Sequence, residues 1–170
     1  MKRALALILL LAACKEDLVD IPAPVPMTDE ALGHFCMMAL ADMHGPKAQI
    51  HLQGLPDPIF FAQVRDGVAY LKEPEQTLPI TAFYVSDLSA APSWEAPGIA
   101  NWLPATEAFF VVGAAVTGGM GAPELAPFST AEDAEAFAAE KGGTVLRLAD
   151  IPADAVLGAI ETVAVDGGGQ

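Results

Sequence analysis

Two stretches of the 170-residue chain share one layout of strand, strand, helix and strand, and this repetition constrains the fold more than any other feature. The first stretch is predicted to contain strands over residues 48–53, 58–64 and 79–85 and a helix over 65–73. The second is predicted to contain strands over 108–114, 124–128 and 144–148 and a helix over 131–141. Short residue matches arise by chance, so the shared layout carries more weight than the few identities. It predicts an α+β protein of two tandem ββαβ-type units with a C-terminal helix.

End signals place the limits of the second unit. Ser129 and Glu132 fit a capping box, in which the Ser129 side chain accepts a hydrogen bond from the Glu132 amide. Gly142 and Gly143 are expected to end that helix. A last helix is predicted over 152–161. The expected organisation is a first unit over 33–103, a second unit with the last helix over 104–163, and a disordered tail over 164–170.

The first fourteen residues are typical of a secretory signal. Lys2 and Arg3 form a positive start, residues 4–13 form an apolar run, and Cys14 follows at once. The run is too short to be a transmembrane helix, so residues 1–13 are predicted to be a signal peptide. Residues 11–14, Leu-Ala-Ala-Cys, resemble a bacterial lipobox, which predicts lipidation of Cys14; the alternative is an ordinary signal with a chance cysteine. Two or more acyl chains anchor a protein stably in a membrane. The secretory signal and the lipobox together place this protein outside the cytoplasm. In a cell with two membranes that is the periplasmic side, with the outer membrane as one location.

The residues after Cys14 are predicted to form an extended, lipidated tether over 14–32. Pro22, Pro24 and Pro26 alternate there, and neither a helix nor a central strand tolerates that spacing.

The net charge of −14 becomes −16 once Lys2 and Arg3 are removed with the signal. Such a charge argues against nucleic acid as a partner, because that binding depends on Lys and Arg replacing phosphate counterions. It favours a partner with a basic face.

Soft metal ligands are concentrated in one short segment. Residues 34–44, which we call the sulfur-rich segment, hold one thiol, three thioethers and two imidazoles, from Cys36, Met37, Met38, Met43, His34 and His44. A further thioether, that of Met120, stands in the glycine-rich run 118–121. Thiolate and thioether donors select Cu(I) over hard cations, whereas zinc is expected to need more cysteine, histidine or carboxylate. Because a cysteine must lose its proton to bind, metal affinity should fall in acid.

Other readings of this segment stay open. A free cysteine is commonly a small core residue, and methionines near aromatic rings commonly fill gaps. On that reading the chain is a metal-free structural or docking lipoprotein of a membrane assembly complex, with Cys36 shielded. A third reading is an enzyme that acts through Cys36, but thiol catalysis usually needs a base or a second thiol. The sequence offers no such thiol, no nucleophile elbow, no phosphate-cradling loop and no zinc-protease motif, so no catalytic residues are predicted.

Several segments, taken in order, resemble the NosL family of copper-binding lipoproteins, which are accessory to nitrous oxide reductase in denitrification. The resemblance covers about residues 35–151. The segments that carry it are 35–38 (Phe-Cys-Met-Met), 44–50, 82–88, 93–95 (Ser-Trp-Glu), 118–124 (Gly-Gly-Met-Gly-Ala-Pro-Glu) and 127–128. Each is weak alone, but their order, their spacing and the lipobox are specific together.

The resemblance implies a lipid-anchored periplasmic Cu(I) chaperone that is not an enzyme. It implies delivery of copper through a NosDFY-type ABC complex for assembly of the nitrous oxide reductase copper centre, and a fold of two similar ββαβ units. Cys36 and Met120 correspond to the family's copper ligands, and Met38 matches a motif methionine. The chain departs from the family where Met37 replaces a glycine and Met43 an acidic residue. His44 and Met37 are further candidates as ligands, and His34 is a weaker one.

Overall fold

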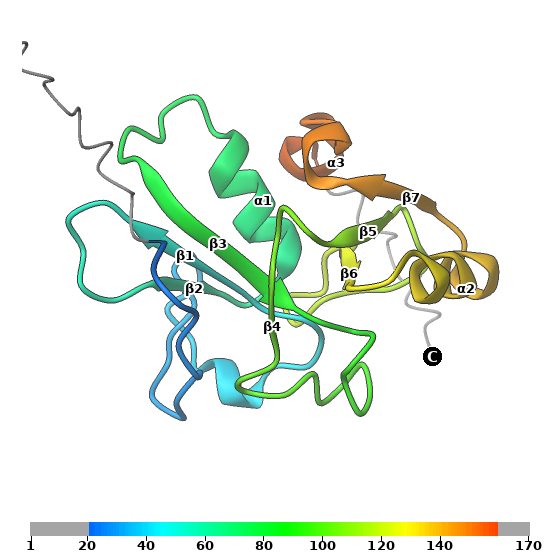
Figure 1. Cartoon of the computed structure of the whole chain (residues 1–170), viewed down its shortest axis with the longest axis horizontal. Coiled ribbons are helices and arrows are strands. Elements are labelled where there is room, and N and C mark those ends of the chain that lie inside the picture. The colour runs from blue at the N-terminus through cyan, green and yellow to red at the C-terminus, as the bar shows by residue number, and fades with distance from the viewer. Residues whose placement is uncertain (1–20, 160–170) are drawn as a thin grey trace, which may run out of the picture.

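The computed structural model describes residues 21–159, which form two antiparallel sheets with helices beside them (Figure 1). The predicted signal peptide over 1–13, the lipidation site Cys14 and the tail over 164–170 lie outside the described residues. Within the described part, no helix is long and apolar enough to cross a membrane.

The first sheet has four strands in the order β2-β1-β3-β4. Its elements are β1 (Ala48–Leu52), β2 (Ile59–Phe61), α1 (Val64–Lys72), β3 (Ile80–Ser86) and β4 (Trp102–Pro104). All neighbouring strands pair antiparallel. Strand β4 was not predicted, because it lies outside the strand, strand, helix and strand layout of the first unit and depends on pairing with β3.

The second sheet repeats the arrangement of the first. Its elements are β5 (Phe109–Val112), β6 (Ala126–Phe128), α2 (Ala131–Lys141) and β7 (Thr144–Arg147), in the strand order β6-β5-β7. In both sheets the first strand of the unit is central, the second strand and the strand after the helix flank it, and all pairs are antiparallel. The predicted α+β fold of two ββαβ-type units is therefore confirmed.

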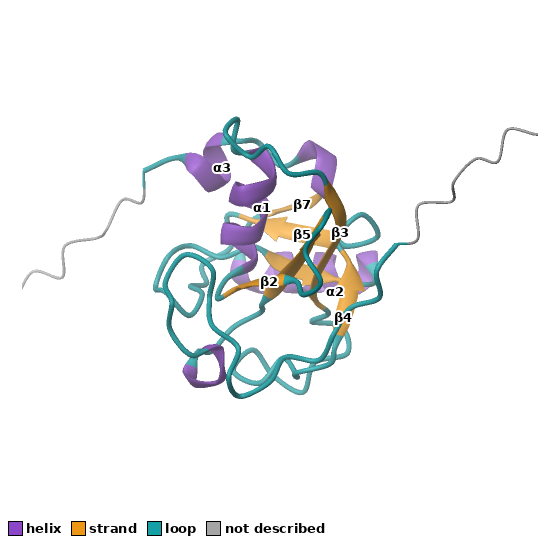
Figure 2. Ribbon diagram, turned by 90° about the vertical axis from the view of Figure 1, so that its left-hand side faces the viewer, coloured by secondary structure: helices purple, strands orange, loops and turns teal. Residues whose placement is uncertain are grey.

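Two short 3₁₀ helices and one last helix complete the described chain. They are η1 (Leu40–Asp42), η2 (Leu148–Asp150) and α3 (Asp154–Leu157). Helix α3 is shorter than the predicted 152–161, whose last two residues lie outside the described part. Helices α1 and α3 pack side by side, as two views of the molecule show (Figures 1 and 2). Helix α2 packs on β5, β6 and β7.

One apolar core joins the two units. Buried side chains of β1 and α1 pack in the same cluster as Phe110 and Leu125 of the second unit and Ile151 and Val156 near the C-terminus. Apolar burial stabilises a fold by about 25 cal/mol per Å² removed from water, so a shared core fixes the relative position of the units. A site between them is held as firmly as one within a single unit.

The cap of α2 lies one residue later than predicted. The side chain of Thr130, not that of Ser129, accepts a hydrogen bond from a helix amide, that of Asp133, at 3.1 Å. Both residue types can cap a helix, and the sequence did not distinguish the register. The helix ends at Lys141, before Gly142 and Gly143, as predicted.

The described part of the predicted tether is extended but is bound to the first sheet. The Tyr84 hydroxyl donates to the Pro22 carbonyl at 2.7 Å, and the side chain of Gln49 both donates to and accepts from the backbone of Val25. Met27 is buried. From Pro22 onward the segment predicted as tether is therefore part of the folded domain.

Candidate metal centre

Cys36 stands on a tight loop, residues 33–39, which we call the Cys36 loop. The Gly33 amide donates to the Met38 carbonyl, the Met37 amide donates to the Gly33 carbonyl, and the His34 amide donates to Phe60 in β2. A Cβ added to Gly33 would lie 2.5 Å from the Cys36 Sγ, so only glycine leaves room for the thiol at its observed place. The loop is therefore closed on itself, attached to β2, and packed against the sulfur.

Met37 occupies a strained backbone position at the tip of this loop. Its φ of +55° is the only positive φ found among the non-glycine residues that the structure describes. Side chains with a Cβ rarely adopt this left-handed conformation, which glycine adopts freely. The loop therefore has a glycine-like backbone at position 37, where the sequence carries a methionine.

Met120 stands on a second tight turn, residues 117–123, which we call the Met120 turn. Thr117 and Pro123 pair across its base, and the Gly118 amide donates to the Ala122 carbonyl at 2.9 Å. Gly121 has a φ of +77°, so the residue after the methionine also needs the freedom of glycine. The Met120 side chain is 46% exposed. The turn therefore presents a thioether to solvent on a constrained backbone.

Cys36 and Met120 line the same cavity, of about 300 Å³, although they come from different units. Its lining is formed by Phe35, Cys36, Gln63, Asp66, Met120 and Ala122. Cys36 is a free cysteine and is half-buried, so its thiol is neither paired nor sealed in the core. The structure thus brings together the two sulfur residues that the sequence singled out from separate segments.

The other sulfur candidates do not line this cavity. Met37 and Met38 are 68% and 53% exposed and stand on the outer side of the Cys36 loop. Met43 packs in an apolar cluster with Met27 and Leu40. Met37 and Met38 thus follow the cavity residue Cys36 directly in sequence and are accessible to solvent, while Met43 packs in the apolar cluster.

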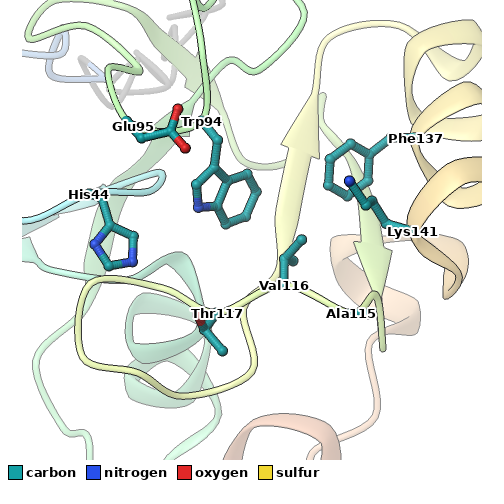
Figure 3. Close-up of a pocket in the computed structure, with 8 residues that line it drawn as sticks. All are labelled: His44, Trp94, Glu95, Ala115, Val116, Thr117, Phe137 and Lys141. Atoms are coloured by element: carbon teal, nitrogen blue, oxygen red, sulfur yellow. The ribbon is translucent and has the colours of Figure 1, made fainter.

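The two histidine candidates lie elsewhere. The His34 ring packs edge-on against Phe61 and Tyr70, with ring centroids 5.6 and 5.4 Å apart. His44 lines a different cavity, of about 400 Å³, together with Trp94 and Glu95 (Figure 3). In that view the three side chains stand on one side of the cavity, opposite Phe137 and Lys141. Closeness in sequence to Cys36 therefore does not bring His44 into the same cavity.

Two polar side chains of the cavity were not found by sequence reasoning. Gln63 is buried and accepts a hydrogen bond from the Met120 amide at 2.9 Å. Asp66 accepts from the Gln63 side chain at 3.4 Å, and its burial raises the pKa of its carboxyl above the ordinary value. Neither belongs to a recognisable motif, because their role depends on contacts with residues far along the chain.

A buried carboxyl lies directly behind the Met120 turn. Glu124 accepts hydrogen bonds from the backbone amides of Val64, Arg65 and Leu125, at 3.2, 2.8 and 2.8 Å. Two of these amides belong to the first turn of α1, whose N–H groups lack partners within the helix. Burial raises the pKa of Glu124 to about 8, against the opposing effect of those donors. The second unit thus supplies the cap for the helix of the first unit.

A buried amine supports the neighbouring segment. Lys47 donates to the carbonyl oxygens of His44 and Gly45. Burial lowers the pKa of Lys47 to about 8, and the negative charge of Glu124 acts in the opposite direction. Gly119 of the Met120 turn packs against this segment, because a Cβ there would lie 3.0 Å from the His44 carbonyl oxygen. The turn is therefore held from two sides.

The donor set of the cavity is suited to a soft ion. It offers one thiol and one thioether beside an aromatic ring, and the described residues contain no group of three or more His, Cys, Asp or Glu side chains placed to hold a metal. Zinc, which prefers four such ligands, is poorly served, whereas few sulfur ligands suit a soft monovalent ion. A site with so few ligands also leaves one side of the ion open to an acceptor.

Comparison with known proteins points to one family. A family model described as NosL matches residues 24–156. A protein from Achromobacter cycloclastes named "Copper-binding lipoprotein NosL" is 52% identical over 92% of this chain and 82% of its own length. A protein of the same name from Stutzerimonas stutzeri is 34% identical over 81% of this chain and 70% of its own.

Solved structures agree with the sequence comparisons. The crystal structure of the copper chaperone NosL from Shewanella denitrificans matches with a TM-score of 0.69 and 31% identity, over 77% of this chain and 96% of that chain. The solution structure of apo-NosL from A. cycloclastes matches with a TM-score of 0.50 and 53% identity, over 68% of this chain and 92% of that one.

Proposed function

The chain belongs to the NosL family, and from this premise we propose that it is a lipid-anchored copper carrier that binds one Cu(I) between Cys36 and Met120. The observation that supports this proposal best is the shared cavity, because two sulfur-containing residues from distant segments, Cys36 and Met120, line one open space. The names of the relatives describe copper binding and chaperoning, which agrees with a carrier rather than a catalyst.

The oxidation state follows from the ligands. A thiolate and a thioether are soft donors, and Cu(I) is the biological copper ion that prefers them. Met38 is the proposed third ligand, since it lies on the same loop as Cys36, is exposed, and matches the motif methionine of the family. Met37 and His44 are secondary candidates, and of these only Met37 shares the loop with Cys36.

Lipidation at Cys14 would keep this acidic protein at a membrane. After removal of the predicted signal peptide the net charge is −16, which gives no attraction to anionic lipid, so an acyl anchor is needed. The lipobox and the relatives named as lipoproteins support an extracytoplasmic location, on the periplasmic side of an inner or outer membrane. Labelling with a radioactive fatty acid tests this: wild type should take up label and the Cys14→Ala variant should not, and equal labelling of both would contradict the anchor.

The recipient of copper is proposed from the resemblance. A NosDFY-type ABC complex would receive the ion for assembly of the nitrous oxide reductase copper centre. The acidic charge of the chain predicts a basic docking face on that partner, and the association rate should fall as salt rises. Association rates measured at two ionic strengths test this, and a rate independent of salt would contradict charge steering.

The central test is a Cu(I) competition titration against a chelator of known affinity. Cys36→Ser and Met120→Leu each remove one proposed ligand, and Met27→Leu makes the same methionine change away from the cavity. Loss of an outer-shell partner alone typically costs about 10–100-fold in metal affinity, so each ligand variant should lose at least that much while Met27→Leu stays near wild type. Undiminished affinity in both ligand variants would overturn the proposal and favour the metal-free docking lipoprotein.

A further inference from the structure

We propose that Gln63 is a positioning residue for copper binding: its side chain holds the Met120 turn against the Cys36 loop and so sets whether the thioether reaches the ion. This inference rests on the proposed Cu(I) function. Gln63 carries no charge and is not offered as a copper ligand. It acts through the backbone of Met120.

The side chain of Gln63 connects its own helix to the other unit. Gln63 immediately precedes α1, yet its side chain makes no capping hydrogen bond to that helix. Its Oε1 instead accepts from the Met120 amide at 2.9 Å, and its Nε2 donates to Asp66 at 3.4 Å. Because Gln63 is 1% exposed, water does not readily replace these partners. Both ends of the amide are therefore used, and its orientation is fixed.

The Met120 turn packs closely against the Gln63 side chain at Gly118. A Cβ added to Gly118 would lie 2.7 Å from the Gln63 Oε1 and 2.8 Å from its Cγ. Glycine at this position lets the turn approach the amide closely enough for the Met120 hydrogen bond. The close approach and the hydrogen bond act on adjacent residues of the same turn.

The other proposed ligand is attached to the same strand. The Cys36 loop is tied to β2 through the hydrogen bond from the His34 amide to Phe60 and through the bridge between Gly33 and Phe60. Gln63 follows the end of β2 by two residues. Strand β2 therefore positions both proposed ligands. The hydrogen bond and bridge at Phe60 hold the loop that carries the thiol, and the Gln63 side-chain amide holds the turn that carries the thioether.

The exchange between the units is reciprocal, which explains why Gln63 is free for this role. The orphan amides at the start of α1 are satisfied by Glu124, four residues after Met120. The cap that the residue before a helix normally supplies thus comes from the second unit. Gln63 in return supplies an acceptor to the second unit.

The test compares Gln63→Leu with a matched exchange in the full chain. Gln63→Leu keeps the size of the side chain and removes both hydrogen bonds. The double variant Gln63→Glu with Asp66→Asn keeps an acceptor for the Met120 amide and reverses the donor and acceptor between positions 63 and 66 without changing the net charge. Each is made in the wild-type and in the Met120→Leu background, and folding is checked by circular dichroism.

We expect Gln63→Leu to lower Cu(I) affinity about tenfold, at the lower end of the range for outer-shell partners of metal ligands. X-ray absorption of the Gln63→Leu protein should show one sulfur ligand fewer than in wild type. The exchange variant should restore both the affinity and the sulfur count. In the Met120→Leu background, Gln63→Leu should cause no further loss of Cu(I) affinity. An equal loss in both backgrounds, or an unchanged affinity and sulfur count, would overturn the inference.

A metal-free measurement separates this inference from the proposed function. In the apoprotein, hydrogen exchange of the Met120 amide should be faster in Gln63→Leu than in wild type, and slow again in the exchange variant. If wild type binds no Cu(I), the copper-carrier proposal fails whatever Gln63 does. If wild type binds Cu(I) and the exchange rate of this amide is the same in Gln63→Leu, the positioning role alone fails.

Discussion

Replacement of Met37 by glycine should stabilise the protein, although it removes a whole side chain. The backbone of Met37 has a φ of +55°, in the left-handed region. Holding a residue with a Cβ there costs roughly 1–2 kcal/mol, which glycine does not incur. The side chain is 68% exposed, so its removal sacrifices little apolar burial.

The net magnitude follows from two opposing contributions. Relief of the left-handed strain favours the variant by roughly 1–2 kcal/mol. The greater conformational freedom of glycine in the unfolded chain opposes it by about 0.4–1 kcal/mol. We therefore expect Met37→Gly to raise the free energy of unfolding by about 0.5–1 kcal/mol, which corresponds to about 2–4 °C in Tm per kcal/mol for a chain of this size.

Urea unfolding of the metal-free protein measures this change, with Met37→Ala as the matched control. Alanine removes the thioether but keeps the Cβ, so it should leave stability near that of wild type, and the slope of the transition should not change in either variant. A Met37→Gly protein that is no more stable than Met37→Ala would refute the strain argument. The same pair reports on copper: if Met37 is not a ligand, both variants should bind Cu(I) as wild type does.

Three further outcomes follow from the structure. Gly33→Ala should lower the free energy of unfolding by about 1–3 kcal/mol, because its Cβ would displace the Cys36 sulfur, and in a Cys36→Ala background most of that loss should vanish. The folded-state pKa of Glu124 is raised to about 8, so the unfolded chain releases this proton at a lower pH than the folded protein does. The free energy of unfolding should therefore fall as pH rises from about 4.5 to 8. Thermal melts across this range should show a smaller fall for Glu124→Gln than for wild type. Thr130→Ala should cost about 1 kcal/mol and Ser129→Ala nearly nothing in the same denaturation assay, and the reverse order would contradict the observed cap.

The secondary structure was predictable because its causes are local. Alternating and continuous apolar runs identified the strands of both units, and the double glycine at 142–143 marked the end of α2. The repeat followed from the order of these elements. Strand β4 and the register of the α2 cap were not predicted, since the first depends on pairing with β3 and the second on a choice between two residues that both cap helices.

The metal centre was predictable only in part. Softness of the donors indicated the sulfur-rich segment and Met120, and the family resemblance selected Cys36 and Met120 among them. The structure places both at one cavity. His44 was a candidate because it lies close to Cys36 in sequence, yet it lines a different cavity. Gln63 gave no signal, because a lone glutamine before a helix resembles many surface residues until its contact with Met120 is known.

The position of the cavity follows from the way in which the two units of the repeat are joined. Two of the contacts between the units lie beside the cavity: Gln63 accepts from the Met120 turn, and Glu124 accepts from the first amides of α1. The two proposed sulfur ligands belong to different units and line one cavity beside these contacts. A single ββαβ unit would carry one sulfur ligand and a helix start without its cap. The repeat thus supplies more than a larger core: it forms the junction at which Cys36 and Met120, from separate turns, line one cavity.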